Sequence, residues 1–196
     1  MNTETSVGIV TPKVMKIQEK LVLESGKTLD SFEITFEVYG NLNKEKTNAV
    51  LICHALSGNH HVAGYHDGEK NPGWWDNMIG PKKPIDTENF FVVSLNNLGG
   101  CHGSTGPRSI DSKTKKFFGS GFPIVTVGDW VNVQKILMDY LKIPYWQIVV
   151  GGSLGGMQSF QWAIQYPALI KNSIIIAAAP RLTAQNIAFN EVARQA

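Results

Sequence analysis

Two short and almost uninterrupted apolar runs constrain the fold of this chain most strongly. Residues 49–53 read AVLIC, and residues 90–95 read FFVVSL. Strands of this composition are buried on both faces, as in the parallel sheets of α/β proteins. Residues 31–39, SFEITFEVY, instead alternate apolar and polar side chains. There we expect a strand with one buried face and one solvent face.

The second half of the chain alternates strand and helix patterns. Residues 126–142 carry apolar side chains at helical spacing, and Pro144 ends that helix. We then expect a strand over 147–150, a helix over 154–166 and a strand over 174–178. This order is typical of βαβ units with right-handed crossovers. The sequence therefore predicts an α/β fold, a mostly parallel central sheet flanked by helices.

Composition and charge exclude several function classes. A chain of 196 residues, 43% of them hydrophobic, can bury the core of one domain. The net charge is only +2, and lysines gather only at Lys113, Lys115 and Lys116, so we expect no nucleic-acid partner. No apolar run is long enough to cross a membrane, and the N-terminus does not resemble a signal peptide. Cys53 and Cys101 form no C-x-x-C motif, which fits a reducing, cytoplasmic location.

Residues 151–155, GGSLG, match the nucleophile-elbow motif G-x-S-x-G between a predicted strand and a predicted helix. In such an elbow the serine occupies a strained turn, and the residues two before and two after it must lack side chains. Neither common phosphate-binding glycine spacing fits this stretch. The two open interpretations of Ser153 are a nucleophile, which the context favours, and a helix N-cap.

An elbow serine needs two backbone N–H groups to bind the oxyanion. One belongs to the next residue, Leu154. The other follows the strand over 49–53, where HALSG makes Leu56 the first candidate and Ala55 the alternative. His54 precedes Ser153 in the sequence. In proteins with a nucleophile elbow of this kind, the catalytic residues follow one another along the chain in the order serine, acid, histidine. We therefore expect His54 to order the oxyanion loop rather than to act as a base.

The triad partners are missing after Ser153. No aspartate and no histidine follows it, and the last residues, NIAFNEVARQA, keep a helical pattern without a stop signal. We therefore expect these residues to be the N-terminal part of a longer enzyme, inactive alone, whose catalytic aspartate and histidine lie beyond residue 196.

The long polar stretch between residues 57 and 88 offers other candidates. Asn59, His60 and His61 are candidate zinc ligands. The two adjacent histidines have no third ligand at a suitable spacing, so we expect no metal site. Trp74, Trp75 and Asp76 either line a site entrance or, as aromatic loops more often do, anchor the loop.

One further pair lies in LNNLGGCHGSTGP, which we interpret as a rigid turn at the rim of the pocket. Cys101 and His102 are adjacent there. Neighbours in an extended loop point apart, so we expect no catalytic dyad.

Five long stretches carry a resemblance to a known family. SVGIV, LICHALSGNHHVAGYH, PGWWDNMIGPKKPIDTENFFVVSLNNLGGCHGSTGP, VVGGSLGGMQSFQWAIQYP and AAAPRLTAQNIAFNEVARQA resemble the homoserine O-acyltransferases of methionine biosynthesis, which have the α/β-hydrolase fold. The resemblance implies a helical lid inserted after the strand over 174–178. Residues 1–180 would then be the N-terminal part of the hydrolase core, and residues 181–196 the start of the lid.

The resemblance also implies a chemistry. Ser153 would accept an acyl group from acyl-CoA and pass it to the hydroxyl of L-homoserine, with Leu56 and Leu154 at the oxyanion positions. Acyl-CoA would be a co-substrate, and no metal or bound prosthetic group is implied. Members of the family form homodimers through the lid helices, so the full-length protein is expected to be a homodimer.

The motifs indicate less directly which acyl group is transferred. HALSGNHHVAGYH and SLNNLGG are more similar to the succinyl-transferring branch than to the acetyl-transferring one. A succinyl carboxylate favours an arginine partner, and Arg108 and Arg181 are the candidates. The alternatives are an acetyl-CoA-dependent transferase, a serine hydrolase of the same fold, and a non-catalytic hydrolase-fold module.

Overall fold

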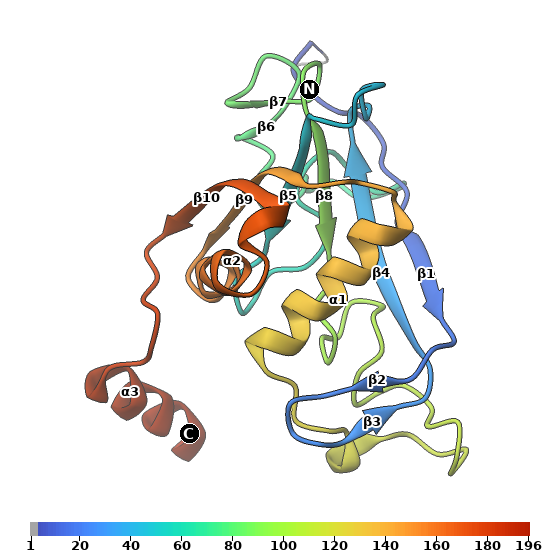
Figure 1. The fold of residues 1–196 in the computed structure, drawn as a ribbon, viewed down its shortest axis with the longest axis vertical. Coiled ribbons are helices and arrows are strands. Elements are labelled where there is room, and N and C mark those ends of the chain that lie inside the picture. Colours follow the sequence, from blue (N-terminus) through green and yellow to red (C-terminus); the bar gives the residue numbers. More distant parts are fainter. Residues whose placement is uncertain (1–3) are drawn as a thin grey trace.

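A computed structural model describes residues 4–196, and six of their strands form one central sheet (Figure 1). The strand order is β1-β4-β8-β5-β9-β10. Strand β4 pairs antiparallel with β1 and with β8, and the remaining pairs are parallel. The strands are β1 (Lys13–Ile17), β4 (Phe32–Tyr39), β5 (Ala49–Cys53), β8 (Phe91–Leu95), β9 (Trp146–Gly152) and β10 (Ile170–Ile176).

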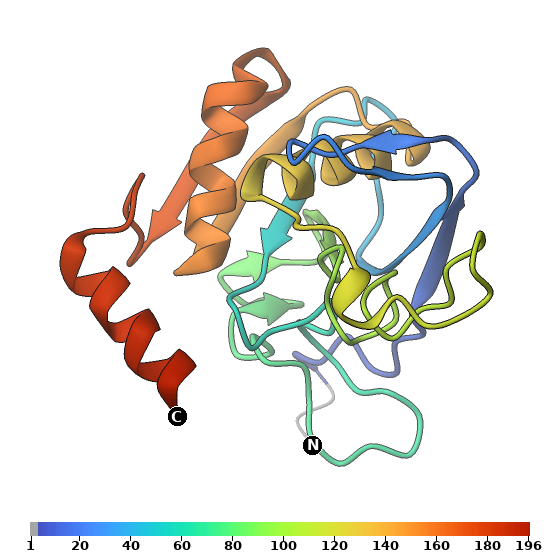
Figure 2. The same ribbon diagram turned by 90° about the horizontal axis from the view of Figure 1, so that it is seen from below.

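Helices α1 (Val127–Tyr140) and α2 (Leu154–Gln165) cover the same face of the sheet (Figures 1 and 2). Thr126 begins α1 with a capping box. Its side chain accepts a hydrogen bond from the Asp129 N–H, and the Asp129 side chain accepts one from the Thr126 N–H. The opposite face is covered by loops and by the small sheet of β6 (Ile79–Gly80) and β7 (Ile85–Asp86). A second small sheet pairs β2 (Leu21–Val22) with β3 (Thr28–Leu29).

The predicted α/β fold is confirmed, with small shifts in the bounds of its elements. The apolar runs form β5 and β8, and the helix expected over 126–142 is α1. The last strand differs most: β10 covers Ile170–Ile176, whereas a strand was expected over 174–178.

The expectation of a solvent face on the strand over 31–39 was wrong. Thr35 and Glu37 are buried, and the Glu37 side chain is 0% exposed. Ile34 and Phe36 pack in the core under α1 and α2, while Tyr39 packs on the opposite face under the loops. The alternation therefore marks two different buried environments. A local pattern does not reveal that a loop will cover the polar face.

A buried polar network joins the two helices to the sheet. The Trp162 Nε1–H donates to Gln134 Oε1 over 2.6 Å, and Gln134 Nε2 donates to Gln158 Oε1. Gln158 Nε2 in turn donates to the carbonyl of His54, at 3.3 Å. Gln134, Gln158 and Trp162 are each 0% exposed. Buried polar groups of this kind need every partner, so the network fixes how α1 and α2 meet the end of β5.

After β10 the chain leaves the sheet. Helix α3 (Ala184–Gln195) lies apart from the sheet and from the other helices in both views, and none of its residues is buried (Figures 1 and 2). Ile187, Phe189 and Val192 expose 54%, 64% and 68% of their surface. The division of the chain near residue 180 stays a prediction. Within residues 4–196, no helix combines the length and apolarity needed to cross a membrane.

We predict that Gln134→Leu destabilises the fold by about 2–4 kcal/mol, because it leaves the Trp162 N–H and the Gln158 Oε1 atom buried without partners. Gln161→Leu is the control, since Gln161 bonds only Gln165 along the partly buried side of α2 and its loss should cost about 0.5 kcal/mol or less. Urea unfolding of both variants measures the difference. Equal losses would contradict the importance of the network.

Candidate active site

Ser153 sits at the turn from β9 into α2 with φ 54° and ψ −120°, a backbone conformation that residues with a side chain rarely adopt. Its N–H donates to the Ile176 carbonyl over 3.0 Å, which holds the turn against β10. The Ser153 side chain is exposed and forms no cap hydrogen bond with α2. Ser153 thus occupies the N-cap position of α2 without capping the helix through its side chain, and the turn has the strain expected of a nucleophile elbow.

The glycines around Ser153 are required by contact, with one exception. A Cβ on Gly151 would lie 2.3 Å from the carbonyl of Gly155, and a Cβ on Gly155 would lie 2.0 Å from the carbonyl oxygen of Cys53. A Cβ on Gly156 would lie 2.6 Å from Ala178 Cβ. At Gly152 the nearest atom would be 3.9 Å away. The first turn of α2 thus touches the ends of β5 and β9, and only Gly152 has room for a side chain.

The two predicted oxyanion residues come together at one cavity of about 470 Å³. Leu154 directly follows Ser153, and Leu56 lies in the loop after β5 and is 84% exposed. Both lie beyond the carboxyl ends of neighbouring parallel strands, where α/β folds place their ligands. The segment from Asn96 to His102 also lines this cavity, which confirms its predicted place at the pocket rim. The role of the two N–H groups stays a prediction.

The two candidate arginines lie elsewhere. Arg108 lines a separate cavity of about 990 Å³, which shares only Phe122 and Pro123 with the cavity beside Leu154. Arg181 lies in the exposed segment before α3 and lines neither cavity. The structure therefore places neither guanidinium in the cavity beside Leu154, and their role in binding a carboxylate stays a prediction.

His54 uses both ring nitrogens to join two loops. The Asn97 backbone N–H can only donate, so His54 Nε2 must accept from it, at 3.2 Å. The proton is then on Nδ1, which donates to the Ala55 carbonyl over 2.7 Å. Burial lowers the pKa of His54, with the Ala55 carbonyl opposing and the charge of His102 adding to the shift. A neutral His54 with no free nitrogen orders the oxyanion loop, as expected, and is not placed to act as a base.

The prediction that Cys101 and His102 point apart was wrong. Cys101 Sγ lies 3.5 Å from His102 Nδ1, and both residues line the cavity beside Leu154. The reason is that the chain bends continuously after the turn at Gly99, so the loop is not extended here.

Trp74, Trp75 and Asp76 anchor their loop, the more common role for such residues. The Trp74 Nε1–H donates to the Asn59 carbonyl over 3.0 Å, and Trp75 packs against the core under the loops. Asp76 accepts from the Gly64 N–H over 2.8 Å and pairs with Lys83 at 2.9 Å.

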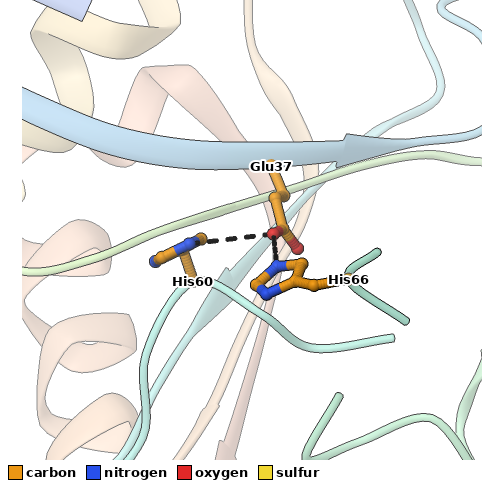
Figure 3. A group of neighbouring side chains, drawn as sticks. All are labelled: Glu37, His60 and His66. Carbon is orange, nitrogen blue, oxygen red and sulfur yellow. Dashed lines mark hydrogen bonds and ion pairs between the residues drawn. The ribbon is translucent and has the colours of Figure 1, made fainter. Parts of the chain in front are cut away.

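A cluster that the sequence patterns did not indicate lies under the same loops (Figure 3). Glu37, on β4, accepts hydrogen bonds from Tyr39, from His61 Nδ1 at 3.0 Å and from His66 Nε2 at 2.6 Å. His60 Nε2 lies 3.7 Å from the same carboxylate. The missing third partner of His60 and His61 is thus Glu37, about twenty residues earlier, together with His66. The adjacent histidines were the only sequence signal, because Glu37 is one of three polar residues that alternate with apolar ones along the strand.

Three members of this polar region, Glu37, Tyr39 and His60, have shifted pKa values. Burial alone would raise the pKa of Glu37, but the hydrogen bonds from His61, Tyr39 and His66 outweigh it and lower that pKa. Burial and the Glu37 charge raise the pKa of Tyr39. Burial lowers the pKa of His60 to about 4, although Glu37 opposes the shift. The carboxylate is therefore ionised and His60 is neutral near pH 7.

We predict that Gly155→Ala destabilises the protein by at least about 2 kcal/mol, because its methyl group would overlap the Cys53 carbonyl. Gly152→Ala should change stability by about 0.5 kcal/mol or less, because the nearest atom to its methyl group would be 3.9 Å away. Thermal or urea unfolding compares the two variants. If both are tolerated equally, the close approach of α2 to β5 is not a packing constraint.

The lowered pKa of His54 predicts a pH dependence of stability. Its folded pKa lies below the unfolded value of about 6.5, so the folded state binds fewer protons. The contribution of neutral His54 is complete above about pH 6.5 and falls as the pH decreases toward the lowered pKa. The unfolding free energy of the wild type minus that of His54→Gln should therefore decrease between about pH 7.5 and about pH 5.5. A difference independent of pH would contradict this assignment.

Comparison with known proteins agrees with this geometry. Residues 48–196 match the family model described as the alpha/beta hydrolase fold. The homoserine O-succinyltransferase of Neisseria gonorrhoeae is 64% identical over 197 aligned positions, which cover 100% of this chain and 52% of that protein. The homoserine O-succinyltransferase of Hahella chejuensis is 63% identical over 97% of this chain and 50% of that protein. The chain spans about half the length of the curated relatives it matches.

Solved structures show the same fold. The esterase E22 superposes with a TM-score of 0.86 at 37% identity, over 94% of this chain and 52% of the esterase. A homoserine O-acetyltransferase from Bacillus anthracis superposes with a TM-score of 0.85 at 33% identity, over 90% of this chain and 48% of that chain. The resemblance to homoserine O-acyltransferases is confirmed by these relatives. With three quarters of its residues matching the family model around the Ser153 turn, the chain belongs to the α/β-hydrolase fold family.

Proposed function

We propose that this chain forms the nucleophile-bearing half of an acyl-CoA-dependent L-homoserine O-succinyltransferase. The observation that carries the proposal is the strained Ser153 turn, with φ 54° and an exposed side chain, beside the cavity lined by Leu56 and Leu154. The names of the relatives at 60–64% identity support the succinyl group over the acetyl group.

The proposed reaction has two halves. Ser153 Oγ attacks the thioester carbonyl of succinyl-CoA, and the Leu56 and Leu154 N–H groups bind the oxyanion. The C–S bond breaks, and coenzyme A leaves as the thiol with the proton from Ser153. The homoserine hydroxyl then attacks the succinyl-serine ester, and its proton returns to Ser153 as O-succinylhomoserine leaves.

Both halves need a base and an acid. Among the described residues, 4–196, no side chain forms a hydrogen bond with Ser153 Oγ, and both nitrogens of His54 are occupied. The proposal therefore assigns the catalytic aspartate and histidine to the part of the enzyme that corresponds to the other half of its relatives. Arg108 and Arg181 remain candidates for the succinyl carboxylate, with neither guanidinium lining the cavity beside Leu154.

The proposal includes the setting of the enzyme. Acyl-CoA serves as co-substrate, and the acyl transfer itself needs no bound metal or prosthetic group. A cytoplasmic location fits the two free thiols of Cys53 and Cys101. A homodimer formed through lid helices fits the apolar side chains that α3 exposes at Ile187, Phe189 and Val192.

A serine esterase is the second candidate, because esterase E22 shares the fold closely at 37% identity. The same serine and oxyanion groups would serve both reactions. They differ only in whether water or homoserine takes the acyl group from Ser153. An acetyl-CoA-dependent homoserine transferase is the third candidate, supported by the Bacillus anthracis neighbour.

Mass spectrometry of the full-length protein after incubation with succinyl-CoA tests the proposal. We expect an adduct of about 100 Da on the peptide that contains Ser153, and its loss when L-homoserine is added. Ser153→Ala should abolish the adduct. Ser120→Ala, at an exposed serine in the Gly119–Gly121 turn, should leave it unchanged.

The other outcomes separate the candidates. An adduct of about 42 Da from acetyl-CoA, with none from succinyl-CoA, would support the acetyltransferase. Rapid release of the acyl group to water without homoserine would support the esterase. An adduct that persists in Ser153→Ala would refute the assignment of the nucleophile.

A further inference from the structure

Three side chains from two distant segments place their ligand atoms together below the loops. Glu37 comes from β4, and His60 and His66 come from the loop after β5 (Figure 3). Glu37 Oε1 lies 2.6 Å from His66 Nε2 and 3.7 Å from His60 Nε2. One ligand atom from each of the three residues lies within 4.8 Å of the others. In a tetrahedral zinc site, with bonds of about 2.0–2.2 Å, neighbouring ligand atoms are about 3.3–3.6 Å apart. The three atoms therefore need only small shifts to surround one cation, which would replace the proton between His66 Nε2 and Glu37 Oε1.

The second oxygen of Glu37 is already held. Oε2 accepts from the Tyr39 hydroxyl and from His61 Nδ1, the latter at 3.0 Å. These bonds fix the plane of the carboxylate and direct Oε1 toward His60 and His66. Carboxylates that bind metals are usually oriented in this way by a partner on the other oxygen.

Hydrogen bonding within the cluster leaves nitrogen atoms unused. Both ring nitrogens of His60 and Nε2 of His61 are buried without a hydrogen-bond partner. Buried polar atoms without partners are uncommon in folded proteins and call for a specific explanation. A cation bound between Glu37, His60 and His66 would give His60 Nε2 a partner and would balance the buried carboxylate with positive charge.

We propose that Glu37, His60 and His66 form a binding site for one divalent transition-metal cation, with Zn²⁺ as the expected occupant. Two imidazoles and one carboxylate are a donor set that zinc binds in proteins. The role is structural, because the acyl transfer proposed above does not pass through this site. This inference departs from the sequence expectation that no metal site is present.

The cation would join the loop after β5 to β4 of the central sheet. The Tyr39 hydroxyl already accepts from the Val62 N–H at 3.0 Å and from the Ala63 N–H at 3.4 Å. A metal bridge from Glu37 to His60 and His66 would add a cross-link at both ends of this segment. The same loop carries Leu56, so the bridge would also limit how far the predicted oxyanion segment can move.

A second group, His61, His66 and Glu69, has a similar composition but a different environment. Glu69 is exposed, with 57% of its side-chain surface accessible, and its Oε2 lies 3.6 Å from His66 Nδ1. A cation held there would face water and would not satisfy His60. The buried group containing Glu37 is therefore the proposed site, and Glu69 supplies a matched control.

Zinc titration of the full-length protein, prepared without a histidine tag and stripped with a chelator, tests the site. With a competing chromophoric chelator we expect one equivalent of Zn²⁺ per chain and a higher unfolding temperature when zinc is bound. Glu37→Gln and His66→Gln should each weaken binding by at least about tenfold, whereas Glu69→Gln should change it by less than about threefold. Absence of stoichiometric binding, or equal losses in Glu37→Gln and Glu69→Gln, would overturn the proposal.

A measurement on the unmodified protein covers the case in which Glu37→Gln does not fold. X-ray absorption of the zinc-loaded wild type should show only nitrogen and oxygen ligands at about 2.0–2.2 Å, with scattering from imidazole rings. A sulfur ligand at about 2.3 Å would place the cation at Cys101 and His102 instead, and would refute the proposed site.

Discussion

The close approach of the first turn of α2 to the end of β5 is the constraint on which the rest of this structure depends. The backbone of Gly155 lies so near the Cys53 carbonyl that no side chain fits between them. Because the helix is held there, the chain must change direction between β9 and α2 within one short turn. Ser153 lies in this turn and adopts a strained backbone conformation with a positive φ. Leu154 consequently begins the helix beside the loop that carries Leu56, and both reach the same cavity.

The loop after β5 is held from both ends by buried polar side chains. At its start, His54 binds the Asn97 N–H and the Ala55 carbonyl, and its own carbonyl accepts from Gln158 on α2. Further on, His61 and His66 bind the Glu37 carboxylate. A loop of this length, without regular structure of its own, would otherwise sample many conformations. The oxyanion segment lies between these two attachments, which makes it a preorganised part of the site.

The two faces of the sheet are stabilised in different ways. Under α1 and α2 the core is mainly apolar, apart from the Gln134 network, and its cohesion comes from packing. Under the loops a smaller apolar cluster lies beside the ionised Glu37 and its imidazoles. A buried carboxylate is tolerated only where hydrogen bonds of suitable geometry reach its oxygens. The face covered by loops therefore depends on the geometry of its hydrogen bonds, whereas the face covered by helices depends on the packing of apolar side chains.

Local patterns in the sequence determined the order of strands and helices, the elbow at Ser153 and the need for glycine at 151 and 155, because periodicity and turn chemistry act over a few neighbouring residues. The choice of Leu154 and Leu56 as oxyanion candidates followed from the places where the nucleophile-elbow motif puts its two N–H donors. Only the tertiary structure decided that Glu37 is buried, that His66 joins His60, and that Arg108 lines a different cavity from Leu154. These outcomes depend on the path that the long loops take across the sheet. The residues that such loops bring together are far apart along the chain, and local sequence patterns extend over only a few residues.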